Sequence, residues 1–195
     1  MPKVVVVEEK RREILAAAAA TFARYGYHGT NLQRVAACAG MGKSSLYHYF
    51  PTRDALFTAL ADGFLRHEAT LFADASHAGD DARAQLRALL EAMVELFDSW
   101  TKVGPLLVDF LCTPHGRRRV RETFRTARGV LARIVRRGQR EGVFRPGAPA
   151  ALATMVLALL DGLFLQELME PASTAGARAA LHDAVARLLR RGSAR

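Results

Sequence analysis

Apolar residues recur three or four positions apart along most of the chain, which places them on one face of an α-helix. In residues 9–25 that face consists of Ile14, Leu15, Ala18, Phe22 and Tyr25. In residues 117–141 it consists of Val120, Phe124, Ala127, Leu131 and Ile134. The strand-like alternation is confined to the short valine run at positions 4–7, which Glu8 interrupts. The pattern therefore predicts an all-α protein.

Glycines, prolines and capping residues divide this pattern into about nine helices. Gly26 ends the first, and the sequence Thr30-Asn31-Leu32-Gln33 matches a capping box that begins the second. Pro51 stops the third, and Thr52 caps the fourth. We expect helices over residues 9–25, 31–39, 43–49, 53–72, 81–99, 103–112, 117–141, 150–169 and 174–191. A polar segment, residues 74–81, forms a joint between the early and late helices.

Two short helices joined by a glycine turn, residues 32–49, match the helix-turn-helix unit. In that unit the second helix enters the major groove of DNA. Its amino end here holds small residues and one lysine: Gly42, Lys43, Ser44 and Ser45. The small residues let the backbone approach DNA, and Lys43 can reach a guanine edge or a phosphate. The segment predicts a nucleic-acid interface.

Four more residues near this unit are candidate phosphate contacts. Tyr47 and His48 are expected at the wall of the groove, whereas Leu46 and Phe50 are expected to point into the core. Two residues lie at helix starts, where the backbone N–H groups attract phosphate: Thr30 and Arg53. Taken singly, each of these residues is more often a cap or a solvated surface group. Their ordered series is what predicts DNA binding.

The charge of the chain favours an anionic partner. It holds 28 Lys and Arg against 19 Asp and Glu, a formal net charge of +9. Residues 1–56 hold eight basic and four acidic residues, a balance of +4. Residues 117–140 hold ten arginines and one acid, Glu122. The apolar spacing of that segment favours a solvated arginine face, and binding to DNA, to an anionic effector or to a membrane is the alternative.

Several other classes of protein fit the sequence poorly. Cys38 and Cys112 are too few for a disulfide framework, and the six histidines lack the spacing of a metal site, so we expect no metal and no cofactor. The run Gly42-Lys43-Ser44 resembles the end of a Walker A loop, but Ala37 stands where its first glycine is needed. No paired carboxylates or nucleophile motif indicate an enzyme. Without a signal peptide or a long uninterrupted apolar run, the predicted location is the cytoplasm, with no membrane partner.

Residues 11–56 resemble the DNA-binding head of the TetR family of transcriptional regulators. The residues that carry this resemblance are Phe22, Gly26, Thr30, Val35-Ala36, Ala39-Gly40, Leu46-Tyr47 and Tyr49-Phe50. Gly42 stands where the family often has serine, and Arg53 stands where lysine is common. The rest of the chain resembles the family more weakly, through its helix count and residues 141–163. The resemblance implies a DNA-binding domain, residues 1–56, followed by an effector-binding and dimerisation domain, residues 57–195.

The resemblance implies a dimer interface in this second domain. The helix over 150–169 is apolar nearly all round, and such a helix must be covered on every side. We expect it to pair with the last helix and with both symmetry mates in an isologous four-helix interface. An ordinary intrachain bundle is the alternative. The expected interface residues are Leu152, Val156, Leu160, Leu163, Leu181, Val185 and Leu188.

The resemblance also implies a pocket for a small effector. Methionine and aromatic residues of the second domain favour a hydrophobic or aromatic ligand, although such residues are more often ordinary core. The candidates are Phe64, His67, Met93, Phe97, Trp100, Leu107, Phe110, Phe124, Met155 and Phe164. Lone acids such as Asp109 and Glu167 could fix a polar or cationic ligand. The whole sequence thus predicts a homodimeric, ligand-responsive regulator that binds double-stranded operator DNA as a repressor; the alternative is an effector-independent architectural or activating DNA-binding protein.

Overall fold

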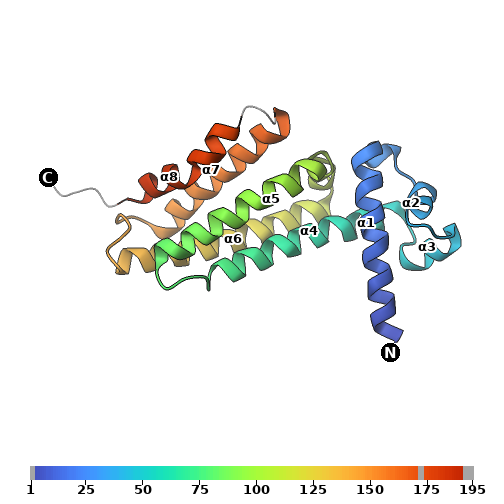
Figure 1. Cartoon of the computed structure of the whole chain (residues 1–195), viewed down its shortest axis with the longest axis horizontal. Helices are drawn as coiled ribbons and strands as arrows, with labels where there is room; N and C mark the ends of the chain where they lie inside the picture. The colour runs from blue at the N-terminus through green and yellow to red at the C-terminus, as the bar shows by residue number, and fades with distance from the viewer. Residues whose placement is uncertain (1–2, 171–173, 191–195) are drawn as a thin grey trace. The chain divides into compact units, whose positions relative to one another are not determined.

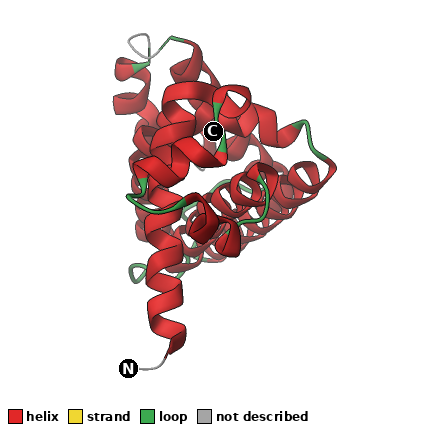
Figure 2. Cartoon of the chain, turned by 90° about the vertical axis from the view of Figure 1, so that its right-hand side faces the viewer, coloured by secondary structure: helices red, strands yellow, loops and turns green. Residues whose placement is uncertain are grey.

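The computed structural model describes residues 3–170 and 174–190, and within them the side chains of 7–96, 104, 106, 108–170, 174 and 176–190. These residues are helical nearly throughout (Figures 1 and 2), with one isolated antiparallel bridge between Phe144 and Arg190. The prediction of an all-α protein is confirmed. The helices are α1 (Lys3–Gly29), α2 (Leu32–Cys38), α3 (Lys43–Tyr49), α4 (Arg53–Ala75), α5 (Ala82–Leu111), α6 (Pro114–Arg140), α7 (Pro149–Met169) and α8 (Ala175–Leu189).

Several helix boundaries differ from the sequence prediction, and α1 begins at Lys3 rather than at residue 9, so the valine run at positions 4–7 is helical. Residues 81–99 and 103–112 were expected as separate helices, but they belong to one helix, α5. The helix continues through Gly104 and Pro105, so neither the polar residues at 101–102 nor this glycine and proline end it. Helix α6 begins at Pro114, three residues before the expected start. Proline suits the first turn of a helix, where its missing N–H would have no partner in any case.

The turn between α1 and α2 is built differently from the predicted capping box. Gly26 interrupts α1 with φ 67° and ψ 177°, a conformation that glycine adopts without steric cost. The side chain of Asn31, rather than that of Thr30, caps α2 by accepting a hydrogen bond from the Arg34 backbone N–H at 2.9 Å. Thr30 is turned inward, and its hydroxyl donates to the Gly26 carbonyl at 2.7 Å. The capping-box prediction is therefore wrong in its N-cap residue.

The chain forms two compact units. The first unit contains residues 1–66 and 102–120, and the second contains residues 67–101 and 121–195. The division at residue 56 predicted from sequence concerns function and stays a prediction. In the first unit, α1, α2 and α3 pack around a continuous apolar core (Figure 1). Its buried residues include Ile14, Ala18, Phe22, Val35, Leu46, Phe50, Leu56 and Phe57.

The second unit is held by apolar faces of α6, α7 and α8. Buried residues recur along one side of α6, while its arginines at 121, 125, 128, 133, 136 and 140 are exposed. This arrangement matches the predicted solvated arginine face. Helix α7 contacts α8. The buried residues of these three helices include Ala127, Val130, Leu131, Ile134, Val135, Leu152, Ala153, Val156, Leu160, Leu181, Val185 and Leu189.

Helix α7 is unusual in its hydropathy. Within the described residues it alone is long and apolar enough to cross a membrane, judged by length and composition. It nevertheless carries two acids, Asp161 and Glu167. One of its faces is buried inside the second unit, with Val156 fully covered and Leu160 nearly so. The buried face belongs to the core of the second unit, and the other side of the helix is exposed in the single chain.

Gly138 on α6 leaves room for the ring of Phe144. A Cβ atom on Gly138 would lie 2.0 Å from Cδ2 of that ring, which is only 6% exposed. We expect Gly138→Ala to lower the free energy of unfolding by about 1–3 kcal/mol through overpacking. Gly129→Ala on the same helix is the matched control, because its nearest neighbouring atom lies 4.0 Å away. That change should raise the free energy by about 0.5–1 kcal/mol. Urea unfolding followed by circular dichroism measures both, and equal effects would contradict the contact.

Glu68 on α4 makes the stability of the second unit depend on pH. Burial raises the pKa of its carboxyl from 4.5 to about 7, and the charge of Asp161 contributes in the same direction. Between these two pH values the folded state binds more protons than the unfolded state, so the free energy of unfolding falls as pH rises. We expect Glu68→Gln to reduce this fall and to stabilise the protein at pH 8 by on the order of 2 kcal/mol. The part contributed by Asp161, whose pKa burial raises from 3.8 to about 6, should remain.

Thermal unfolding from pH 4.5 to 8 tests this expectation. Glu95→Gln changes an exposed glutamate of α5 in the same way and is the control. It should keep the pH dependence of the parent chain. An unchanged slope in Glu68→Gln would show that another group is responsible.

Candidate nucleic-acid interface

Helix α3 is anchored by one side and open to solvent on the other. Leu46 is completely buried in the core of the first unit, and Phe50, the C-cap of the helix, is 1% exposed. The predicted inward orientation of both is confirmed. The predicted DNA contacts on the helix are all exposed, namely Lys43, Ser44, Ser45, Tyr47 and His48. The structure thus brings these candidates together on one outer surface.

The first turn of α3 consists of small residues and one lysine, Lys43. Gly42 is its N-cap, with extended backbone and no side-chain cap. Ser44 and Ser45 follow in the first turn, so the backbone can lie close to a surface such as a DNA edge. The Lys43 ammonium lies 5.7 Å from the centre of the Tyr47 ring. This contact directs the lysine along the exposed face, where it can reach a base edge or a phosphate.

A second basic cluster lies on α1 and α2. Tyr25 is 41% exposed, although the sequence suggested a packing residue. The guanidinium carbons of Arg24 and Arg34 lie 5.2 Å and 4.7 Å from the centre of its ring. Sequence reasoning did not single out these two arginines. The signal that could have found them is charge, because residues 14–53 contain four Lys or Arg and no Asp or Glu.

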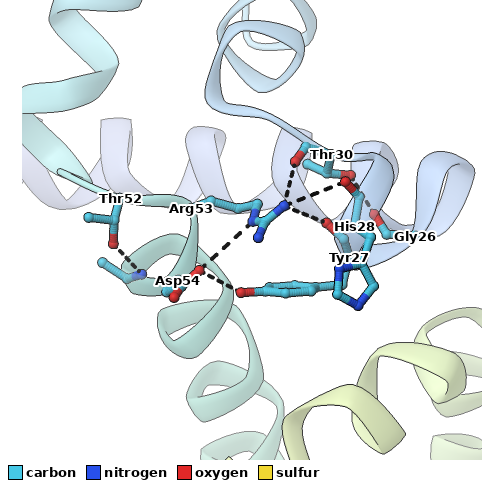
Figure 3. A network of polar contacts seen from close by, with 8 residues as sticks. Gly26, Tyr27, His28, Thr30, Thr52, Arg53 and Asp54 are labelled. Carbon is cyan, nitrogen blue, oxygen red and sulfur yellow. Dashed lines mark hydrogen bonds and ion pairs between the residues drawn. The ribbon is translucent and has the colours of Figure 1, made fainter.

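Two predicted phosphate contacts have internal partners instead (Figure 3). Thr30 is 2% exposed, and its hydroxyl donates a hydrogen bond to the Gly26 carbonyl. The Arg53 guanidinium donates to the carbonyls of Tyr27, His28 and Thr30 at 3.4–3.5 Å. These carbonyls end α1, where a cation is favourable. The structure therefore gives both side chains a role inside the head, and we do not propose them as DNA contacts.

Tyr27 joins this turn to the start of α4. Its ring lies 4.3 Å below the Arg53 guanidinium and 4.7 Å from the ring of Phe57. Its hydroxyl donates to Asp54 at 2.5 Å, and burial together with that carboxylate raises the pKa of the phenol (Figure 3). The Thr52 hydroxyl accepts the backbone N–H of residue 55 at 3.0 Å, which confirms the predicted cap. The end of α1, which leads into the helix-turn-helix, is thus fixed to the first turn of α4.

Farther along α4, Asp62 fixes the helix to α6 within the first unit. Its two carboxylate oxygens meet Arg119 at 2.9 Å and His115 at 3.3 Å. The His115 ring also stacks edge-on against Phe110, with centroids 5.9 Å apart. Movement of α4 would therefore disturb a partly buried ion pair as well as the Tyr27 contacts.

The predicted effector-pocket residues belong to both compact units and differ in burial. Phe110 is buried in the aromatic core of the first unit, against Phe57 at 6.0 Å. Phe124 and Met155 are 38% and 54% exposed. Helical spacing alone could not tell core from surface for these residues. Phe64 and Phe164 are half-buried, Met93 is buried and His67 is exposed. The side chains of Phe97, Trp100 and Leu107 lie outside the described residues.

The predicted dimer-interface residues face inward. Six of them are at most 7% exposed within a single chain, so they have little surface for a partner: Leu152, Val156, Leu160, Leu163, Leu181 and Val185. Leu188 is half-buried. Because α7 is apolar all round, the sequence could not show which side the chain itself covers. Its opposite face exposes four large apolar residues, Met155, Leu159, Leu165 and Met169.

Comparison with known families identifies both parts of the chain. Residues 14–60 match the model of the bacterial regulatory proteins of the TetR family. Residues 109–190 match the C-terminal domain of BetI-type transcriptional repressors. The first match covers α2 and α3 entirely, and the second covers α6, α7 and α8. Together they span two thirds of the sequence.

Individual relatives agree with these models. The chain is 45% identical to the regulator RutR of Escherichia coli K12 over 40 residues, which are 20% of this chain and 19% of RutR. It is 32% identical to the repressor KstR2 of Rhodococcus jostii over 81 residues, 42% of this chain and 40% of that protein. A solved regulator from Saccharomonospora viridis, in complex with choline, matches with a TM-score of 0.80, 27% identity and coverage of 95% of this chain and 100% of that one. The chain belongs to the TetR family of transcriptional regulators.

Proposed function

We propose that this regulator is a homodimeric repressor that binds a palindromic operator through α3 and leaves it when a small organic effector binds. One observation carries the proposal: the exposed face of α3. Lys43 and Tyr47 share that face, and Leu46 fixes it to the core. No acid occurs between positions 14 and 53 to repel a phosphate backbone. The relatives with matching sequence are transcriptional regulators, not enzymes.

The DNA contacts divide into two groups. The small first turn and Lys43, with Ser44 and Ser45 beside it, would approach the base edges of the major groove. Tyr47 and His48 would contact phosphates at its wall. Arg24 on α1 adds a phosphate contact on the outside, whereas the Arg34 guanidinium donates to the Gly29 carbonyl at the end of α1. Phosphate contacts position the protein, and the contacts from the start of α3 select the sequence.

For the dimer, we propose the outward face of α7. Its four exposed large apolar residues lie alongside Ala151, Ala158 and Gly162, whose small size lets a second helix approach closely. Two copies related by a two-fold axis would bury these faces against each other. Two heads then read two half-sites separated by about 34 Å, one turn of DNA, or a multiple of it.

Release of the repressor from the operator would occur through a movement of α4, which contributes residues to both compact units. Its first turn is fixed through Tyr27, Arg53 and Asp54 to the end of α1, which leads into the helix-turn-helix. An effector that prefers a different position of α4 would therefore change the placement of the heads, to the extent of that preference. The choline complex of the Saccharomonospora viridis relative supports a small ligand for this fold. We retain a small hydrophobic or aromatic effector as the expected class, and the cytoplasm as the location.

Selection of bound sequences from a random pool of DNA duplexes tests the proposal. The expected result is a palindrome whose half-sites lie about 10 base pairs apart, or a multiple of that spacing. Enrichment without a shared sequence would instead support an architectural DNA-binding protein whose affinity falls with salt for every duplex alike. Expression from a promoter that contains the selected palindrome then separates repression from activation.

A further inference from the structure

A groove of about 670 Å³ opens in the second unit. It lies between the first two turns of α5, residues 143–144 and the last turns of α8. The segment between α6 and α7, which contains residues 143–144, is held against α8, because the Arg145 backbone N–H donates to the Leu189 carbonyl at 2.8 Å. The volume falls within the range of sites that bind small molecules, roughly 300–1,000 Å³.

The floor of the groove is apolar and fixed. It is formed by Leu86, Leu90 and Phe144, which are 5%, 2% and 6% exposed. Phe144 is held on its other side by Gly138, where no larger residue fits. A hydrocarbon chain or an aromatic ring placed on this floor would lose contact with water without requiring the core to rearrange.

The rim of the groove is strongly basic. Four arginines line it, together with a single acid, Asp183. That acid pairs with Arg187 at 2.8 Å, and Arg87 lies 3.9 Å from Glu91. The other two rim arginines, Arg83 and Arg190, have no acidic partner among the described residues. Guanidinium groups bind carboxylates through two parallel hydrogen bonds, so these two are suited to an anion.

A third feature of the groove is an unused polar atom. His182 lines it, and the Nε2 atom of this ring is buried without a hydrogen-bond partner among the residues that the structure describes. Buried polar atoms almost always have a partner, which can be a ligand or a water molecule. The groove therefore combines an apolar floor, a cationic rim and one unsatisfied imidazole nitrogen.

We propose that this groove binds an amphipathic carboxylate, with its apolar part on Leu86, Leu90 and Phe144 and its carboxylate held by Arg83 and Arg190. A neutral molecule would leave the rim uncompensated, and a cation would be repelled by it. A highly charged anion without an apolar part would leave the floor exposed to water. The residues of the groove are not those of the DNA-binding surface, so its occupancy can be measured without operator DNA.

Isothermal titration calorimetry with octanoate tests the site on the full chain in the absence of DNA. We expect saturable binding of octanoate, and binding at least about tenfold weaker for octan-1-ol and for octyltrimethylammonium. The double variant Arg83→Gln/Arg190→Gln should weaken octanoate binding by about tenfold or more. Equal binding of octan-1-ol would overturn the role of the charge, and no binding of octanoate would overturn the site.

A matched control separates the groove from the general positive charge of the protein. Arg133→Gln/Arg136→Gln removes two exposed arginines of α6 that do not line the groove. Octanoate should bind this variant as it binds the parent chain. An equal loss of affinity in both double variants would mean that octanoate responds to net charge only. Because no DNA is present, failure here would leave the proposed regulator function intact, and failure of operator binding would leave the groove intact.

Discussion

Replacing Lys43 or Tyr47 with alanine will weaken operator binding by about 10- to 100-fold without changing the fold or the oligomeric state. Each side chain is exposed on α3, and the two lie together as an ammonium over a ring. A base or phosphate contact of this kind contributes about 1–3 kcal/mol, which corresponds to that loss. Neither residue contributes to the buried core of the first unit, so circular dichroism should be unchanged.

Fluorescence anisotropy with the selected operator measures both variants. Lys10→Ala is the matched control, because this lysine belongs to the same compact unit but pairs with Glu13 on α1 at 2.6 Å. It should bind the operator within a small factor of the parent chain. If Lys43 contacts a phosphate, its variant will also lower the slope of log affinity against log salt by about one. Normal operator binding by both α3 variants would remove α3 as the reading helix.

Charging the outward face of α7 will convert the proposed dimer to a monomer. In Met155→Glu/Leu159→Glu, two carboxylates replace side chains that are 54% and 41% exposed in a single chain. Since both positions already face water there, the fold of the monomer should persist. In a dimer the two acids of each chain would be buried without partners, which costs several kcal/mol. We expect loss of the dimer and, with it, a loss of operator affinity of about 100-fold or more, because one head reads only one half-site.

Sedimentation equilibrium measures this change directly. Val108→Glu is the control, since it places the same charge at an exposed apolar position, 50% accessible, on α5. It should leave the dimer intact. A dimer that survives in Met155→Glu/Leu159→Glu would place the interface elsewhere, whereas an unfolded variant would show that this face belongs to the core of the single chain.

The head could be predicted closely from sequence because local signals determine it. Gly26, Pro51 and Thr52 mark where helices end or begin, and short helices leave few choices for their inward residues. The roles of Thr30 and Arg53 could not be predicted in this way. A threonine or an arginine at a helix end is equally suited to a phosphate and to a neighbouring carbonyl, and only the fold shows that the carbonyls are within reach.

For the rest of the chain, prediction from sequence failed for a different reason. Helix α7 is apolar on all sides, so periodicity could not distinguish the face covered by Leu152 and Val156 from the face that exposes Met155 and Leu159. The groove proposed to bind a carboxylate could not be predicted from the sequence either. Its parts come from residues 83–90, 143–144 and 182–190, which only the packing of α5, α8 and their loops brings together.

The most direct test of the account is the specificity of DNA binding. Fluorescence anisotropy at physiological salt would compare the intergenic DNA beside the protein's own coding region with a scrambled duplex of the same composition. The account predicts tighter binding to the intergenic DNA by about 10³-fold or more, with one dimer on each palindrome. Equal affinity for this DNA, for the selected palindrome and for the scrambled duplex, falling in parallel as salt rises, would contradict it.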